Sequence, residues 1–437
     1  MIFLYLSALV LVCQATEKTR YDGHQVLKIS PRTMADAQYV LQLIKTHGLD
    51  LWHVHRNENV FDVNVHQNVM EKVKQLLNER DIPFSTWIHD IQSLIDTQFV
   101  SNQRERRATR NIALTRYNEF DTILAYMNQL DSSNPAGGIR SETTNIGSSA
   151  EGRPIMLTKI YNASSTTAKP AIFVDGGIHA REWISPAFVL YLIDQLKNNP
   201  SSSAEVSEIV NAFDWYIVPV LNPDGYSFSH ASDRLWRKNR RINSNSACHG
   251  VDLNRNFGYQ WNPAIGGSTS PCSDIYAGVG AFSEAESQAV RNFLMNGINF
   301  ASYLTVHSYG QMWLYPWGYT SALPNDWQSL DAAAQTATTK LYERYKTRYS
   351  VGSSTNVLYS AAGGSDDYAK GGAGIKYSYT LELRDTGRYG FVLPVDQITP
   401  TCMETMDAFI AFAKDIQGQT QRKPNAHDRK PYVLLGK

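Results

Sequence analysis

The sequence predicts an α/β protein with a mixed, largely parallel central sheet flanked by helices, preceded by a smaller α+β domain. Two patterns lead to this prediction. Before residue 90, strand-like and helix-like segments follow the order β-α-β-β-α-β, which is the ferredoxin-like split arrangement. From about Tyr117 onward, strands and helices alternate, as they do in folds built on a parallel sheet with crossover helices.

The chain begins with an apolar run, MIFLYLSALVLVCQA, that ends in small residues and is followed by polar ones. The run is too short to span a bilayer, so residues 1–15 are expected to be a cleaved signal peptide, with an N-terminal anchor as the alternative. No other segment approaches membrane-spanning length. We therefore expect a secreted, extracellular protein with no membrane partner.

The smaller domain is predicted to contain four strands, in HQVLKI, LDLWHV, NVFDVNV and PFSTWI. Amphipathic patterns predict two helices, over 34–45 and 69–77, and a short helical connector is expected over 91–99. The histidines of this domain, His53 and His55, lie in no catalytic context and are expected to be structural.

A basic segment, RERR (104–107) with Arg110 just beyond, follows the connector. A solvated charged loop is one interpretation, and in a cytosolic chain the segment would suggest nuclear import. In a secreted chain, between two domain patterns, it favours a linker that a trypsin-like protease cuts to activate the protein. The predicted organisation is an activation propeptide with its linker over 16–107, a main domain over 108–418 and a flexible polar tail over 419–437.

The charge balance argues against two classes of partner. The chain has 41 basic and 41 acidic residues and a formal net charge of zero. This balance gives no electrostatic reason to expect a nucleic-acid partner or a charged membrane surface. With 437 residues the chain can bury a sizeable core, and we expect it to be a monomer.

Three cysteines remain once the signal peptide is removed, at 248, 272 and 402. In an oxidising compartment Cys248 and Cys272 could close a modest disulfide loop, which would leave Cys402 unpaired.

The main domain begins its strand and helix pattern with AIFVD (171–175), a continuous apolar run expected of a strand that is buried on both faces. Ser185 and Pro186 are predicted to be the N-cap and first residue of the next helix. Ser283 and Glu286 have the spacing of a capping box that would begin another helix. Further strands are predicted in WYIVPV, ASYLTVH and YSYTLEL.

Candidate metal ligands follow two of these strands. His179 and Glu182 lie in the loop after AIFVD, which in an α/β sheet is at the carboxyl edge where active sites are built. His307 ends the strand ASYLTVH. Two His and one Glu from separate strand ends are the ligand set of a catalytic zinc, with a fourth position for water. Taken alone, the His-x-x-Glu pair would be interpreted as part of a hydrogen-bonded loop. Taken alone, His307 would be interpreted as a structural histidine at the end of a strand.

A zinc-activated water also needs a general base. Glu382 lies near the end of YSYTLEL, at the same predicted edge of the sheet. The alternative is a carboxylate in a salt bridge, with Arg384 or Arg388 as its partner.

Six blocks of the sequence carry a family resemblance: HAREWISP, RLWRKNR, GVDLNRNFG, TVHSYG, YSAAGGSDDY and TLELRDTGRYGF. In this order they resemble the signature blocks of the zinc metallocarboxypeptidases related to pancreatic procarboxypeptidases A and B. The resemblance covers nearly the whole chain except the C-terminal tail. It implies a zymogen that is cut near Arg107 or Arg110 and then removes C-terminal residues from peptides and proteins. The alternative is a catalytically silent relative that binds peptides, but every assigned position holds a competent residue.

The resemblance implies one Zn²⁺ per chain, bound by His179, Glu182 and His307. It also implies that Asp252 accepts a hydrogen bond from His179 and so fixes the tautomer of this ligand.

The same resemblance implies the catalytic and carboxylate-binding residues. Glu382 would be the general base and then the general acid, and Arg237 would stabilise the oxyanion. Asn254 and Arg255 would hold the substrate's terminal carboxylate, for which a planar guanidinium is well shaped. Tyr359 would close over this end of the substrate as a mobile cap.

Specificity is expected to depend on Asp366, which occupies the family position at the base of the pocket for the last side chain. An enclosed carboxylate there pairs with Lys or Arg, so the resemblance favours a B-type enzyme, closest to carboxypeptidase B. The alternatives are an exposed loop acid at 366, or an A-type enzyme that prefers aromatic or aliphatic C-termini. Arg181 would contact the substrate farther from the cut, and Gly318 lines the pocket. The GGAG stretch before Glu382 is one residue longer than the family spacing.

Overall fold

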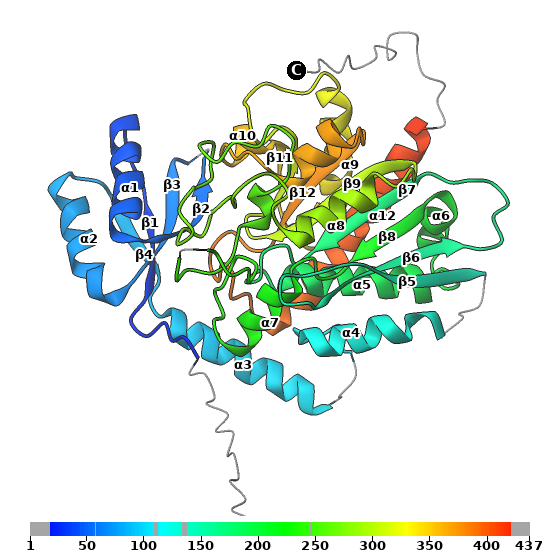
Figure 1. Ribbon diagram of the computed structural model, residues 1–437, viewed down its shortest axis with the longest axis horizontal. Helices are drawn as coiled ribbons and strands as arrows, with labels where there is room; N and C mark the ends of the chain where they lie inside the picture. Colours follow the sequence, from blue (N-terminus) through cyan, green and yellow to red (C-terminus); the bar gives the residue numbers. More distant parts are fainter. Residues whose placement is uncertain (1–17, 57, 109–111, 133–137, 245, 421–437) are drawn as a thin grey trace, which may run out of the picture.

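The computed structural model describes residues 18–56, 58–108, 112–132, 138–244 and 246–420 (Figure 1). The predicted signal peptide, Arg110 and nearly all of the predicted tail lie outside the described residues. At the start of that tail, the last helix continues to Thr420.

The N-terminal part has the predicted ferredoxin-like order of elements. Its elements are β1 Gln25–Ile29, α1 Met34–His47, β2 Asp50–His55, β3 Val60–Val65, α2 Gln67–Glu79 and β4 Phe84–Ile88. The strands form one antiparallel sheet in the order β2-β3-β1-β4. Thr33 begins α1, because its side chain accepts a hydrogen bond from Asp36 N while the Asp36 carboxylate accepts one from Thr33 N.

The connector to the main domain is a longer helix than the sequence predicted. The prediction ended it near residue 99, whereas α3, Ile91–Ala108, continues through RERR (Figure 1). Gln, Glu, Arg and Ala are strong helix formers, so the charge run extends the helix instead of ending it. Gln98 anchors α3 to the main domain, donating to Leu393 O at 2.7 Å and accepting from Arg234 Nε at 2.8 Å.

The main domain contains one mixed sheet of eight strands. These are β5 Ile139–Ser148, β6 Pro154–Asn162, β7 Ala171–Gly176, β8 Asp214–Val218, β9 Phe300–Ser308, β10 Met312–Tyr315, β11 Ser350–Ser353 and β12 Tyr377–Leu383. Their order is β11-β10-β12-β9-β7-β8-β6-β5. The central strands β12, β9, β7 and β8 are parallel, and antiparallel strands follow on both sides. The predicted mixed, largely parallel sheet is confirmed.

Helices cover both faces of this sheet (Figure 1). The helices are α4 Phe120–Gln129, α5 Ile184–Asn198, α6 Ala204–Ala212, α7 Pro223–Ala231, α8 Ala285–Leu294, α9 Trp327–Tyr345, α10 Ser354–Val357, α11 Ser365–Asp367 and α12 Ile398–Thr420, with short turns η1 Leu130–Ser132, η2 Leu253–Arg255, η3 Tyr368–Gly372 and η4 Val395–Gln397. Helices α5, α6, α9 and α12 share one core with the sheet, and α8 packs in a second core. Strand β7 contributes Ile172 and Val174 to the first core, and Ala171 and Phe173 to the second, so it is buried on both faces as predicted.

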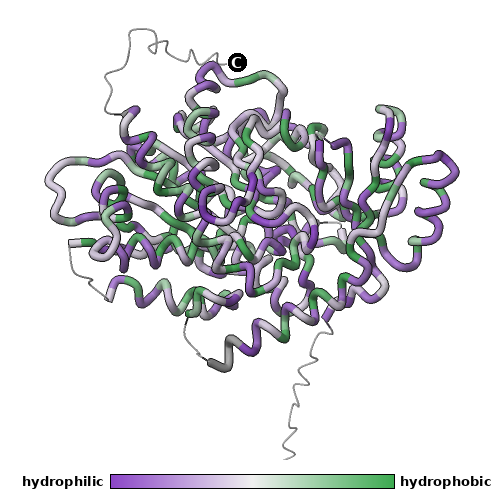
Figure 2. Tube along the Cα trace, turned by 180° about the vertical axis from the view of Figure 1, so that it is seen from behind, coloured by the Kyte–Doolittle hydropathy of each residue, from purple (hydrophilic) through white to green (hydrophobic). Residues whose placement is uncertain are grey.

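Apolar residues recur at short intervals along the helices in Figure 2, as expected of helices that bury one side. Among the helices that the structure describes, none has both the length and the apolarity needed to cross a membrane.

The predicted start of α5 was wrong. Its N-cap is Trp183, and Ser185 lies inside the first turn, fully buried. The Ser185 hydroxyl accepts from Gly177 N at 2.9 Å and donates to Val306 O at 2.5 Å. The serine therefore ties the loop after β7 to strand β9, a tertiary contact that local capping rules do not include.

The predicted capping box of α8 was also wrong. The N-cap is Glu284, and no side-chain hydrogen bond caps the helix. Ser283 donates to the Glu284 side chain, and Glu286 turns inward to accept from Asn239 Nδ2 at 3.2 Å. The buried polar network takes both side chains away from the helix end.

Candidate metal centre and adjoining cleft

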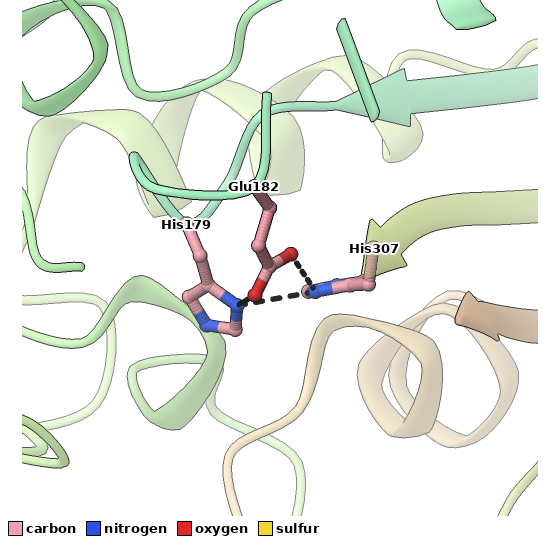
Figure 3. A group of neighbouring side chains, drawn as sticks. All are labelled: His179, Glu182 and His307. Atoms are coloured by element: carbon pink, nitrogen blue, oxygen red, sulfur yellow. Dashed lines mark hydrogen bonds and ion pairs between the residues drawn. The ribbon is translucent and has the colours of Figure 1, made fainter. Parts of the chain in front are cut away.

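Three candidate ligands meet at the carboxyl edge of the central sheet (Figure 3). His179 and Glu182 lie in the loop between β7 and α5, and His307 lies near the end of β9. Strands β7 and β9 are adjacent and parallel, so the loop after one comes beside the end of the other. The side chains of His179, Glu182 and His307 point toward one another in Figure 3.

The ligand atoms have the geometry of a metal site. His307 Nδ1 lies 3.1 Å from both His179 Nδ1 and Glu182 Oε2, and His179 Nδ1 lies 2.7 Å from Glu182 Oε1. All three residues are buried and their ligand atoms lie within 4.8 Å of one another. Zinc bonds to His nitrogen and carboxylate oxygen are about 2.0–2.2 Å long, so one ion fits between these atoms. The donor set and its spacing fit zinc.

The electrostatics of the metal-free site differ among the three candidate ligands. Burial lowers the pKa of His179, and the Arg237 guanidinium lowers it further, so the imidazole is neutral. Burial alone would raise the pKa of Glu182, but His179 and His307 beside it lower that pKa. Burial also lowers the pKa of His307, but the Glu182 carboxylate outweighs it and raises that pKa to about 9, so zinc binding would displace a proton from His307. Neutral imidazole and ionised carboxylate are the forms that bind zinc.

Asp252 is placed behind His179, at the start of η2. Its Oδ1 accepts from His179 Nε2 at 3.1 Å. Its Oδ2 accepts from Arg237 Nε at 3.0 Å and Arg237 Nη2 at 2.9 Å. One carboxylate therefore orients both a candidate ligand and the candidate oxyanion-stabilising arginine.

Glu382 is next to the ligands, because β12 is parallel to β9 and pairs Glu382 with His307. Its Oε2 is buried and has no hydrogen-bond partner among the described residues. Burial raises the pKa of Glu382 to about 8. The alternative salt bridge is not formed with Arg384, whose Nε donates instead to Glu404 at 2.7 Å.

A cleft opens from this site. It brings together most of the residues that the sequence singled out: His179, Glu182, Arg237, Asn254, Arg255, His307, Gly318, Tyr359, Asp366 and Glu382 all line it. Arg181 is not among the lining residues. It is buried, and its Nη1 forms an ion pair with Asp50 Oδ2 at 2.9 Å.

Arg255, in the lining of the cleft, is held from several sides. Arg255 Nε donates to Gly266 O at 2.7 Å, and Nη1 donates to Asn254 O at 2.9 Å. The Tyr359 hydroxyl lies 3.4 Å from Arg255 Nη2. These contacts fix the guanidinium plane before any ligand arrives.

The two neighbouring aspartates have different roles. Asp367 accepts from Gly318 N at 2.9 Å and Tyr319 N at 3.1 Å, so it holds the loop after β10. Asp366 is only 5% exposed, lines the cleft and lies 3.5 Å from the Ser354 hydroxyl. The alternative of an exposed loop acid at 366 is wrong. Burial raises the pKa of Asp366.

The N-terminal domain lies against the cleft, as expected of a propeptide that covers the active-site face. Trp52 and His53 of β2 line the cleft. The Trp52 ring packs edge-on against Phe391, and the His53 ring lies 5.3 Å from that of Tyr309. The expectation that His53 is structural holds only in part, since it also borders the site. The sequence showed only that Trp52 and His53 are neighbours on a strand. The alternation of side chains along a strand does not show which part of the molecule either residue will contact.

The first two residues of the longer GGAG stretch end a π-helical turn, η3, after which Ala373 N donates to Tyr368 O at 2.9 Å. A π-turn takes up one extra residue locally, so Glu382 keeps its place beside His307.

Elsewhere, Cys248 and Cys272 form the disulfide, and Cys402 is buried and free.

Comparison with known proteins agrees with the site. Residues 123–408 match the family model described as zinc carboxypeptidase, and residues 27–98 match the model described as carboxypeptidase activation peptide.

The relatives include proteins named carboxypeptidase B and proteins named carboxypeptidase A. The chain is similar to carboxypeptidase B of Astacus astacus, with 48% identity over 69% of this chain and 98% of that protein. It is similar to carboxypeptidase A1 of Bos taurus, with 38% identity over 91% of this chain and 94% of the relative. The solved structure of carboxypeptidase A from Helicoverpa armigera superposes with a TM-score of 0.84 at 28% identity, covering 92% of this chain and 99% of that one. The chain therefore belongs to the zinc carboxypeptidase family, as a metallocarboxypeptidase of the pancreatic procarboxypeptidase type with an activation peptide.

Proposed function

We propose that the chain is the secreted zymogen of a B-type carboxypeptidase, which hydrolyses C-terminal Lys or Arg from peptides and proteins. The observation that carries this proposal is Asp366, a buried carboxylate that lines the same cleft as the candidate metal ligands. An enclosed carboxylate favours a cationic side chain and disfavours an apolar one.

His179, Glu182 and His307 would hold the single Zn²⁺ of the family. When bound, zinc supplies the Lewis acidity that activates a water and polarises the scissile carbonyl. Glu382 accepts the proton of that water on its unpaired Oε2 and passes it to the leaving amine. Arg237, held by Asp252, places a fixed positive charge where the carbonyl oxygen becomes negative.

The substrate's C-terminus would be bound at the closed end of the cleft. Arg255 and Asn254 hold the terminal carboxylate, and Tyr359 covers it. The last side chain then extends toward Asp366, past Gly318. Arg181 contacts the peptide farther from the scissile bond once Asp50 has left it.

Activation is proposed to require cleavage near Arg107 or Arg110 by a trypsin-like protease, releasing the segment 16–107 from the catalytic domain 108–418. Residue 107 is in the last turns of α3, so cleavage there needs local unwinding of the helix end, where opening costs little. The proposal also includes secretion of the protein after removal of the signal peptide, residues 1–15. It further includes a flexible C-terminal tail over 419–437 and a monomeric state.

The test compares kcat/KM on matched peptides that end in Arg and in Phe, using trypsin-treated protein with and without a chelator. Preference for Arg, its loss in Asp366→Ala and inhibition by the chelator are expected. A preference for Phe would support an A-type enzyme instead, and Arg preference that survives Asp366→Ala would show that another residue sets the specificity. Absence of any peptidase activity would favour a silent relative.

A further inference from the structure

A line of buried hydrogen bonds extends from the far side of His307 into the sheet. Tyr303, Thr305 and His307 alternate along β9, so their side chains lie on one face of the sheet. Asp175 on β7 is in register with Thr305 and shares that face. All four side chains are at most 1% exposed.

On the far side of His307, the contacts indicate which group donates each hydrogen bond. The Thr305 hydroxyl lies 2.7 Å from Asp175 Oδ1 and 3.2 Å from His307 Nε2, and the Tyr303 hydroxyl donates to Asp175 Oδ2 at 2.6 Å. A carboxylate only accepts, so the single hydroxyl proton of Thr305 goes to Asp175. The Thr305 oxygen then accepts from His307 Nε2–H. In the neutral imidazole with its proton on Nε2, Nδ1 is free to bind a metal, and Nδ1 is the atom that faces Glu182 and His179.

The arrangement matches the one behind the other imidazole. His179 also presents Nδ1 to the site and Nε2 to a buried aspartate, Asp252. The difference is that His307 reaches its aspartate through a hydroxyl. A hydrogen bond on the remote nitrogen raises the basicity of a metal-binding imidazole and fixes its orientation.

We propose that Thr305, supported by Asp175, is a positioning residue for the metal centre, which holds His307 in the tautomer that binds Zn²⁺. This inference rests on the metal site of the proposed function. It assigns a purpose to Asp175, the only charged residue of the otherwise apolar strand β7. If Asp175 were purely structural, its carboxylate would only accept hydrogen bonds from the two buried hydroxyls. The test must therefore separate a structural role from a positioning role.

The chain offers a matched control. Thr305→Val removes the hydroxyl at nearly constant volume, and with it the hydrogen bond to His307. Tyr303→Phe removes an equally buried hydrogen bond to the same Asp175 but none to His307. Thr305→Ser keeps the hydroxyl. The zinc dissociation constant of each intact zymogen is measured by competition with a chelator, alongside the unfolding of the zinc-free protein.

Thr305→Val is expected to raise the zinc dissociation constant about 10–100-fold, with Tyr303→Phe and Thr305→Ser within about threefold of the wild type. Equal effects of Thr305→Val and Tyr303→Phe would overturn the proposal. A wild-type zymogen that does not bind one equivalent of zinc would instead contradict the metal site itself. If Thr305→Val does not fold, nitrogen NMR of the zinc-loaded wild-type zymogen decides, with Thr305→Ser identifying the His307 signals. A proton on His307 Nε2 is expected, and one on Nδ1 would overturn the proposal.

Discussion

At the scale of single residues, Glu382 combines an unpaired buried oxygen with a position beside His307. Glu382→Gln keeps the size of the side chain but cannot accept the proton, so kcat should fall about 10²–10⁴-fold after activation. Zinc content should stay at the wild-type level, because Glu382 is not among the proposed ligands. Rates on peptide substrates and metal analysis of the same preparation check both statements. Turnover at the wild-type rate would show that another group is the base.

Asp366 leads to a prediction about pH. Burial raises its pKa, so it loses its charge at a higher pH than an ordinary Asp as the solution is acidified. The preference for a cationic side chain should therefore decline as pH falls through this raised pKa and be largest above it. The quantity to measure is the ratio of kcat/KM for Arg-ending and Phe-ending peptides, because protonation of Glu382 affects both substrates and cancels. The ratio should depend much less on pH in Asp366→Asn, and a flat wild-type profile would contradict the assignment.

At the scale of elements, the loop after β10 forms one wall of the pocket through Gly318. Its amide donates to Asp367, and a Cβ at this position would lie 2.8 Å from Ala361 O. Gly318→Ala must therefore move the backbone at 361, two residues from the proposed cap, Tyr359. We expect a loss of about 1–3 kcal/mol of stability from overpacking and a rise in KM for Arg-ending peptides. Thermal unfolding and kinetics measure these effects, and Gly280→Ala, where no atom lies within 4 Å of the added Cβ, is a comparison outside the pocket. A variant with wild-type KM would exclude Gly318 from the pocket wall.

The elements that sequence patterns predicted well are those whose chemistry is local. The apolar run AIFVD and the strands that end in His307 and Glu382 required no knowledge of distant contacts, and the parallel edge followed from their order. Ser185 and Glu286 were mistaken for caps because their partners, Val306 and Asn239, are far away in the sequence. The role of Thr305 was missed for the same reason, because its partner Asp175 is also far away in the sequence. The spacing of two residues between Thr305 and His307 places them on one face of the strand.

At the scale of the whole molecule, the N-terminal domain covers the cleft by contacts that no sequence pattern joined. Trp52 and His53 border the site, the Asp62 carboxylate accepts from the Tyr309 hydroxyl at 3.1 Å, and α3 is anchored through Gln98. The N-terminal domain has a core of its own, and a separate cluster joins its Trp52 and Ile88 to Tyr309 and Phe391 of the main domain. A partly buried ion pair between Asp50 and Arg181 adds to these contacts.

This ion pair gives the last prediction. Arg181 is 2% and Asp50 21% exposed, so Asp50→Asn leaves a buried guanidinium without its nearest carboxylate and should weaken docking by about 1.5–3 kcal/mol. The fraction of uncut zymogen with an open cleft, and hence its residual activity on a small Arg-ending substrate, should rise about tenfold to a hundredfold. Asp22→Asn is the control, because its pair with Arg20 is exposed on both sides and should contribute almost nothing. The activity of the two uncut variants is compared with that of wild type, and after complete removal of the activation segment both should match it. Uncut Asp50→Asn with wild-type residual activity would show that the apolar contacts of Trp52 close the cleft without the ion pair.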